Sequence, residues 1–138
     1  MRYLLDTNIC VYAIKRHASV IGRLEALSPE DLGVSIISVA ELWFGAAKSS
    51  RPEATRKAVD AFLRPFEALP FDAAAAVAYA TVRLDLERRG RPIGERDLLI
   101  ASTALARRLV VVTHNVSEFG RIAGLKIEDW AGSAAHGG

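Results

Sequence analysis

Hydrophobic positions along this chain fall into two patterns, short continuous apolar runs and longer stretches with helical spacing. The runs at residues 2–5, 32–36 and 108–113 have continuous apolar cores, which is typical of strands buried on both faces. Segments at 67–71 and 125–127 are shorter candidates for extended structure. Between these segments the apolar spacing predicts helices at 9–15, 19–27, 38–48, 52–63, 73–89 and 95–107, and a helical turn at 116–119.

Strands that alternate with helices predict an α/β protein, with a mainly parallel sheet and helices on both of its faces. The strand at 108–113 is the most apolar, so we expect it at the centre of the sheet. Asp72 is a good N-cap for the helix at 73–89, and Gly90 is a good residue to end it. The chain shows no internal repeat or long linker, which predicts one domain over residues 1–130. The small-residue tail at 131–138 is expected to be disordered.

Composition narrows the class of protein. The hydrophobic fraction of 51% and the charged fraction of 25% are ordinary for a globular domain, and no apolar run approaches the ~20 residues of a membrane span. One cysteine, Cys10, excludes an intramolecular disulfide and a thiolate zinc cluster. Without a signal peptide, the chain is expected in the cytoplasm. The net charge of +2 does not indicate a nucleic-acid binder, although the run Arg88-Arg89-Gly90-Arg91 is a candidate for phosphate contacts.

Acidic residues stand near the ends of several hydrophobic runs. Asp6 follows the first strand, Glu41 follows the second, and Asp97 lies at the start of the helix at 95–107. Side chains at the carboxyl ends of parallel strands meet in one crevice. Carboxylates that meet there repel one another unless a cation such as Mg²⁺ binds between them. The placement therefore predicts a metal site and suggests phosphodiester chemistry.

Each of these carboxylates also has an ordinary structural interpretation. Asp6 could cap the helix that follows it. Ser38 and Glu41 fit a capping box, with Ser38 as the N-cap and Glu41 three residues later. Asp97 stands where the helix macrodipole favours a negative charge. Only their occurrence together favours a shared site over three separate helix caps.

A second group of polar residues follows the strand at 108–113. Thr113 and Asn115 could bind a phosphate or a water on the metal, and Asn115 could equally cap the turn at 116–119. Glu118 is a possible fourth acid, although a surface charge is the more ordinary interpretation. Trp43 and Phe44 follow Glu41, where they would be core residues or the wall of a groove for a partner helix.

Two alternatives to a metal-dependent nuclease remain open at this level. A haloacid-dehalogenase-like phosphatase would use Asp6 as a nucleophile, but such enzymes have a second aspartate two residues later, where this chain has Asn8. A module that binds nucleic acid or protein without cutting it would need none of the acids for its function.

Four short motifs, in this order, resemble those of the PIN-domain ribonucleases, and in particular of the VapC toxins of bacterial toxin–antitoxin pairs. They are Leu4-Leu5-Asp6-Thr7-Asn8, Ser38-Val39-Ala40-Glu41-Leu42, Ile93-Gly94-x-x-Asp97-x-Leu99-Ile100-Ala101, and Val112-Thr113-x-Asn115-x-x-Glu118-Phe119. The resemblance covers residues 1 to about 130 and implies a PIN-domain fold, a compact three-layer α/β/α sandwich.

The resemblance also implies an activity and partners. Such proteins cleave RNA, commonly tRNA, with Mg²⁺ or Mn²⁺, and so inhibit translation and growth. It implies that Asp6 and Asp97 are the metal ligands and that Glu41 completes the acidic site. Relatives often have an aspartate near position 115, where Asn115 stands, which leaves Glu118 as a substitute. A homodimer is implied, and so is a VapB antitoxin that inhibits the toxin, binds operator DNA, and lies across the active-site groove near Trp43.

Overall fold

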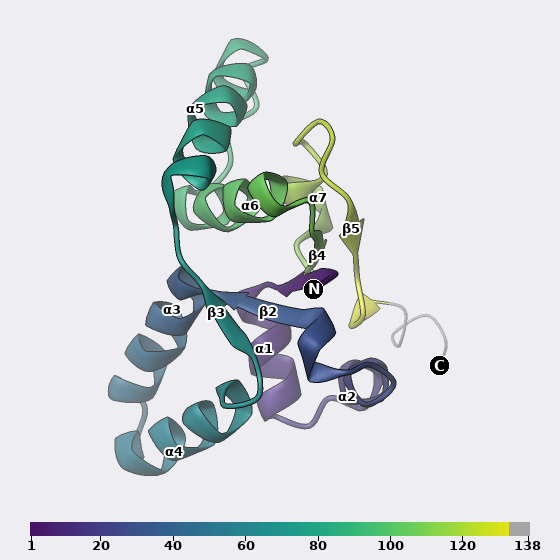
Figure 1. Cartoon of the computed structure of the whole chain (residues 1–138). Coiled ribbons are helices and arrows are strands. Elements are labelled where there is room, and N and C mark those ends of the chain that lie inside the picture. Colours follow the sequence, from purple (N-terminus) through teal and green to yellow (C-terminus); the bar gives the residue numbers. More distant parts are fainter. Residues whose placement is uncertain (133–138) are drawn as a thin grey trace.

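The computed structural model describes residues 1–132 and contains a five-stranded parallel sheet (Figure 1). Its strand order is β3-β2-β1-β4-β5, so the first strand in sequence occupies the middle of the sheet. Every pair of neighbouring strands runs parallel. The strands are β1 (Tyr3–Leu5), β2 (Leu32–Ser35), β3 (Glu67–Leu69), β4 (Val110–Val112) and β5 (Ile127–Glu128).

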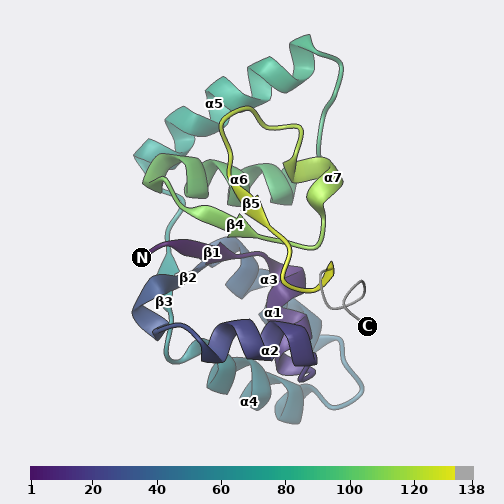
Figure 2. The same cartoon turned by 90° about the vertical axis from the view of Figure 1, so that its right-hand side faces the viewer.

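Helices cover both faces of this sheet, as the α/β/α prediction requires. The elements α1 to α4 lie on one face, and α5 to α7 lie on the other (Figures 1 and 2). The helices are α1 (Thr7–Ile14), α2 (Ala18–Glu25), α3 (Ile36–Ala47), α4 (Pro52–Leu63), α5 (Ala73–Arg88), α6 (Glu95–Arg107) and α7 (Val116–Phe119), with a 3₁₀ turn over Pro29–Asp31.

The central strand shows why the strand sequences are continuously apolar. Tyr3 and Leu5 of β1 belong to the hydrophobic cluster under α1 to α4, whereas Leu4 belongs to the cluster under α5 and α6. Successive side chains of a strand point to opposite faces, and here both faces are covered. Neither face of β1 is exposed to solvent, and all three of its residues are buried.

The helix α6 begins and ends where its sequence predicted. It buries Leu98, Ala101 and Ala104 against the sheet, and the small alanines allow a close approach. The neighbouring helix α5 is capped by Asp72, which accepts a hydrogen bond from the backbone N–H of Ala75. Beyond α5, Gly90 adopts the left-handed conformation with φ of +66°, which glycine takes without strain.

Three predictions about the elements are wrong. The strand β4 is an interior strand that pairs with β1 and β5, but the order of the sheet puts β1, and not β4, in the middle. The helix α3 starts at Ile36 with Ser35 as its N-cap, so Ser38 is not a cap and the proposed capping box with Glu41 does not exist. The last strand is shifted to Ile127–Glu128, in register with β4.

The packed domain continues slightly past the predicted boundary at residue 130. Trp130 is fully buried and packs edge-on against Tyr3, with ring centroids 5.3 Å apart. Ala131, which the sequence assigned to a disordered tail, is 5% exposed and belongs to the same hydrophobic cluster. The remainder of that predicted tail, residues 133–138, lies outside the described residues. Among the helices described, none has the length and apolar character needed to span a bilayer.

Candidate active site

The predicted acidic residues meet at the carboxyl edge of the sheet. Asp6 directly follows β1, and Thr113 directly follows β4, whose last residue is paired in register with Leu5. The Thr113 hydroxyl therefore reaches across the two strand ends and donates a hydrogen bond of 2.8 Å to Oδ2 of Asp6. Asp6 also caps α1 by accepting from the backbone N–H of Thr7 at 2.8 Å. The structural and the functional interpretations of Asp6 are thus compatible.

Glu41 reaches the same edge from the second turn of α3. Its Oε1 lies 2.7 Å from the Thr7 hydroxyl, which also lies 2.8 Å from the Ser38 hydroxyl. Because an ionised carboxylate only accepts, Thr7 must donate to Glu41 and accept from Ser38. The other oxygen, Oε2, accepts from the guanidinium of Arg96 at 2.8 Å. The carboxylate of Glu41 thus bonds directly to side chains of α1 and α6, and Ser38 of α3 bonds to the same Thr7 hydroxyl.

Asp97 is joined to the cluster by Asn115. The two amide hydrogens of Asn115 go to Oδ2 of Asp97, at 2.9 Å, and to Oε2 of Glu118, at 2.6 Å. Asn115 does precede α7, but its side chain makes no capping bond to that helix. Glu118 also accepts from the backbone N–H of Gly94 at 3.2 Å, so it belongs to the cluster and is not an isolated surface charge.

The electrostatics confirm that the carboxyl groups act on one another. Burial, followed by the charges of Asp6 and Glu118, raises the pKa of Asp97 to about 6. Burial also raises the pKa of Asp6, and the charge of Glu41 adds to that rise, while the Thr113 hydroxyl opposes it. The hydrogen bond from Asn115 lowers the pKa of Glu118. Ionisation of Asp6 and Asp97 is therefore disfavoured at this edge, and a bound cation would favour it.

The donor set suits a hard cation, because all the charged ligands on offer are carboxylate oxygens. Within residues 1–132, however, no three His, Cys, Asp or Glu side chains form a group arranged to hold a metal ion by themselves. Mg²⁺ is commonly bound by one or two carboxylates and keeps several waters. A site with Asp6 and Asp97 as its two protein ligands satisfies both facts.

Two hollows meet at this cluster. An open cleft of about 400 Å³ is lined by Glu41, Gly94, Glu95, Arg96 and Asp97. A second groove of about 400 Å³ begins at Thr7 and Glu41 and runs between α1, α3 and α4 over mainly apolar side chains.

Trp43 and Phe44 are exposed, so the prediction of core residues is wrong. Neither lines the groove at the active site, and Trp43 lines hollows beside α4 instead. From α3 the apolar groove is lined by Glu41, Leu42, Gly45 and Ala46. Trp43 points instead toward α4, where its indole donates to Asp60 at 3.0 Å and stacks under Arg56. Phe44 is 62% exposed.

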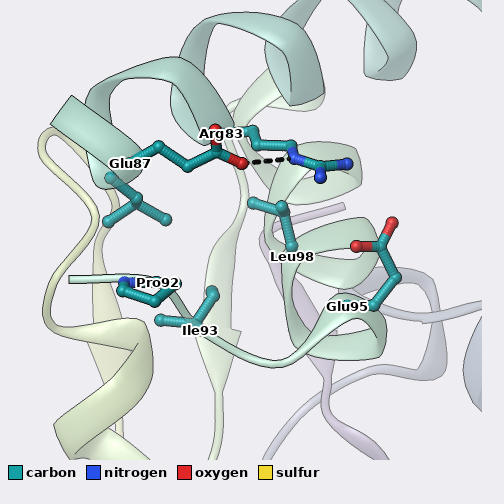
Figure 3. Close-up of a pocket in the computed structure, with 7 residues that line it drawn as sticks. Arg83, Glu87, Pro92, Ile93, Glu95 and Leu98 are labelled. Carbon is teal, nitrogen blue, oxygen red and sulfur yellow. Dashed lines mark hydrogen bonds and ion pairs between the residues drawn. The ribbon is translucent and has the colours of Figure 1, made fainter. Parts of the chain in front are cut away.

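A separate small cavity lies behind the start of α6. It has a volume of about 110 Å³ and is bounded by α5 on one side and by the segment leading into α6 on the other (Figure 3). Arg83 and Glu87 of α5 form an ion pair of 2.8 Å across from Pro92 and Ile93. None of the clustered carboxyl residues lines this cavity. The segment that leads into α6 forms part of its wall, but the cavity is not part of the acidic cluster.

Comparison with known proteins identifies the family of this chain. The family model of the PIN domain matches residues 3–125. The chain belongs to the PIN-domain family. This assignment removes the support for the phosphatase alternative, which rested on Asp6 alone.

Individual relatives extend over almost the whole chain. The "Ribonuclease VapC2" of Rickettsia felis is 43% identical and the "tRNA(fMet)-specific endonuclease VapC" of Shigella flexneri is 37% identical. These alignments cover 94% and 95% of this chain, and 98% and 99% of the relatives. A DNA-bound VapBC crystal structure from Salmonella typhimurium matches with a TM-score of 0.90 and 39% identity, over 94% of this chain and 98% of that one.

Two contributors to the cluster were given no role from the sequence. Thr7 was visible beside Asp6, but its contact with Glu41 spans 34 positions of the chain. Arg96 was visible beside Asp97, but its contact with Glu41 spans 55 positions. In both cases the sequence shows only that the residue is next to a predicted metal ligand. It does not show which residue of another helix it contacts.

Proposed function

We propose that this PIN-domain protein is a divalent-metal-dependent endoribonuclease of the VapC type, with its active site at the acidic cluster. The observation that carries the proposal is the meeting of Asp6, Glu41, Asp97 and Glu118 from four separate elements at one edge of the sheet. A structural role does not require this arrangement, because burial, together with the charges of neighbouring carboxylates, raises the pKa of Asp6 and of Asp97.

Each side chain has a distinct part in this mechanism. Asp6 and Asp97 would hold the cation, which is Mg²⁺ with Mn²⁺ as a substitute. Glu41 completes the anionic pocket, and Glu118 replaces the fourth acid that position 115 lacks. Thr113 orients Asp6, and Asn115 sets the spacing of Asp97 and Glu118.

When bound, the cation lowers the pKa of a water molecule and offsets charge on the phosphoryl oxygens. Single-stranded or looped RNA fits best, because its backbone can bend into the cleft.

The proposed substrate is tRNA, with initiator tRNA as the first candidate, because the Shigella flexneri relative is named for it. The same proposal includes a VapB-like antitoxin, because the matched Salmonella typhimurium structure is a VapBC complex on DNA. The apolar groove that begins at Thr7 is the surface we assign to an antitoxin segment. This chain would form a homodimer. Its antitoxin, and not the chain itself, would bind operator DNA. The cytoplasm, where tRNA is found, is the proposed location.

The direct test is cleavage of total bacterial tRNA by antitoxin-free protein, with Mg²⁺ or Mn²⁺ and with EDTA. We expect discrete fragments that require the metal and vanish in Asp6→Ala. Asp85→Asn, at an exposed aspartate on α5, is the matched control and should cut normally. Well-folded, metal-loaded protein that cuts neither tRNA nor ribosomal RNA would instead support a binding module without catalysis. In cells, induction should stop growth, and growth arrest by Asp97→Asn would contradict a catalytic cause.

A further inference from the structure

Arg96 lines the acidic cleft, and no structural role explains a positively charged residue at this position. It lies in the first turn of α6, where the helix macrodipole disfavours positive charge. Its ion pair with Glu41 is largely in solvent, since 70% of the Arg96 side chain is exposed. Exposed pairs of this kind contribute little to stability. Neither the helix nor the fold therefore accounts for an arginine here.

The composition of the cleft gives Arg96 a different significance. Three of the five residues that line it carry carboxylates, and Arg96 is the one cation among them. A polyanion that enters such a cleft is repelled unless a positive group meets its phosphates. Within residues 1–132, the other hydrogen bonds to the clustered carboxylates come from neutral donors, such as Thr113 and Asn115. The charge of Arg121 also acts on Glu118, but Arg121 donates to the Pro92 carbonyl and does not line the cleft. Arg96 is thus the cation that lines the cleft where RNA would enter.

The geometry of the pair leaves Arg96 able to do so. One guanidinium nitrogen, Nη1, is 2.8 Å from Oε2 of Glu41. Among residues 1–132 its remaining donors have no hydrogen-bond partner. Glu41 itself is only 21% exposed and is also held by Thr7, so it stays in place when Arg96 moves. Arg96 is the less constrained partner of this pair, because its side chain is mostly exposed and, among residues 1–132, bonds only to Glu41.

We propose that Arg96 is a substrate-binding residue that exchanges Glu41 for an RNA phosphate when substrate enters the cleft. In the free protein the pair with Glu41 keeps the guanidinium at the mouth of the site. In the complex the planar fork of donors binds a phosphate next to the cluster. The exchange also leaves Oε2 of Glu41 without its ion-pair partner. This inference rests on the proposed function, because it assumes that RNA is the substrate.

The test measures RNA binding without cleavage. A fluorescein-labelled single-stranded oligoribonucleotide is titrated with the full chain in EDTA, and anisotropy is followed at several KCl concentrations. We expect Arg96→Gln to weaken binding about tenfold and to reduce the slope of log K against log salt by about 0.7, which is one phosphate contact on a single strand. Arg96→Lys should restore most of the slope but only part of the affinity, because lysine lacks the fork.

Arg107→Gln is the matched control. Arg107 belongs to the same helix, roughly 16 Å further along, and it also forms one exposed ion pair, with Asp72 at 3.2 Å. Its removal should leave the affinity and the salt slope unchanged. An equal loss in Arg107→Gln would overturn the assignment of a specific contact, because it would show a general charge effect.

A double-mutant cycle separates direct contact from an effect through Glu41. If Arg96 touches RNA, then Arg96→Gln weakens binding in the Glu41→Gln background as well. If it only neutralises Glu41, its effect disappears in that background, and the inference is overturned. Cleavage of tRNA by the wild-type protein in Mg²⁺ is measured in parallel. Wild-type protein that binds and cuts RNA, with Arg96→Gln binding equally well, would refute this inference alone.

Discussion

Asp97→Asn should stabilise the metal-free protein while abolishing its activity. Burial and the charges of Asp6 and Glu118 raise the pKa of Asp97 from 3.8 to about 6. The folded protein therefore binds this proton more tightly than the unfolded chain. The resulting stability is fully present below pH 3.8 and is lost as the pH rises through about 6. At pH 7.5 the ionised Asp97 destabilises the fold.

The size of the effect follows from that difference in pKa. For a fully buried group it corresponds to about 3 kcal/mol. Asp97 is only partly buried, so solvent screening reduces the value to roughly 1–2 kcal/mol. The asparagine can still accept the hydrogen bond from Asn115 and can donate to Glu118, as the protonated carboxyl group does. No new unsatisfied polar group is expected to offset the gain.

Urea unfolding in EDTA measures this prediction. Asp97→Asn should exceed the wild type by about 1–2 kcal/mol at pH 7.5, and the two should converge near pH 4. Asp85→Asn is the control, because Asp85 is exposed and pairs only with Arg89 on the same helix. It should change stability by less than about 0.5 kcal/mol at either pH. A gain in Asp97→Asn that is the same at both pH values would refute the reasoning, because the cause would not be ionisation.

Added metal should make the wild type more stable than Asp97→Asn. A cation at 100 times its Kd stabilises the protein that binds it by about 2.7 kcal/mol. We expect Mn²⁺ or Mg²⁺ to stabilise the wild type and to leave Asp97→Asn unchanged. Equal stabilisation of both would show that Asp97 is not a metal ligand.

Three further predictions follow from the same contacts. Thr113→Val removes the hydroxyl that lowers the pKa of Asp6, so Mn²⁺ binding by calorimetry should weaken roughly tenfold; unchanged affinity would mean that this hydroxyl does not prepare Asp6. At subsaturating Mg²⁺ the rate of RNA cleavage should rise with pH to a plateau above about pH 6, because Asp97 must ionise to bind the cation, and a flat profile from pH 5 to 7.5 would contradict this. Trp130→Ala should lower the free energy of unfolding by about 3–5 kcal/mol, because the indole is fully buried against Tyr3; a loss below about 1 kcal/mol would show that the C-terminal segment is not part of the core.

The local part of the fold could be predicted from the sequence. The helix α6 was bounded correctly because Pro92 and Gly94 precede it and apolar spacing runs through it to Arg107. The start of α3 was misplaced because Ser35 and Ser38 are both good caps, and the end of β2 decides between them. The order of the strands was not readable, because an apolar run shows that a strand is buried but not which strands it pairs with.

The sequence by itself determined which acids could form the site: Asp6 and Glu41 follow buried strands of a parallel sheet, and Asp97 opens an apolar helix. Only the tertiary structure decided how they are held. It gave Glu118 a place in the cluster through Asn115, and it brought Arg96 to Glu41 across 55 positions of the chain. Trp43, for which the sequence allowed either the core or a groove wall, is exposed and bonds to Asp60 of α4, away from the groove at the active site. The physical reason is that strand ends are fixed by local periodicity, whereas contacts between side chains of different helices depend on how those helices pack on the sheet.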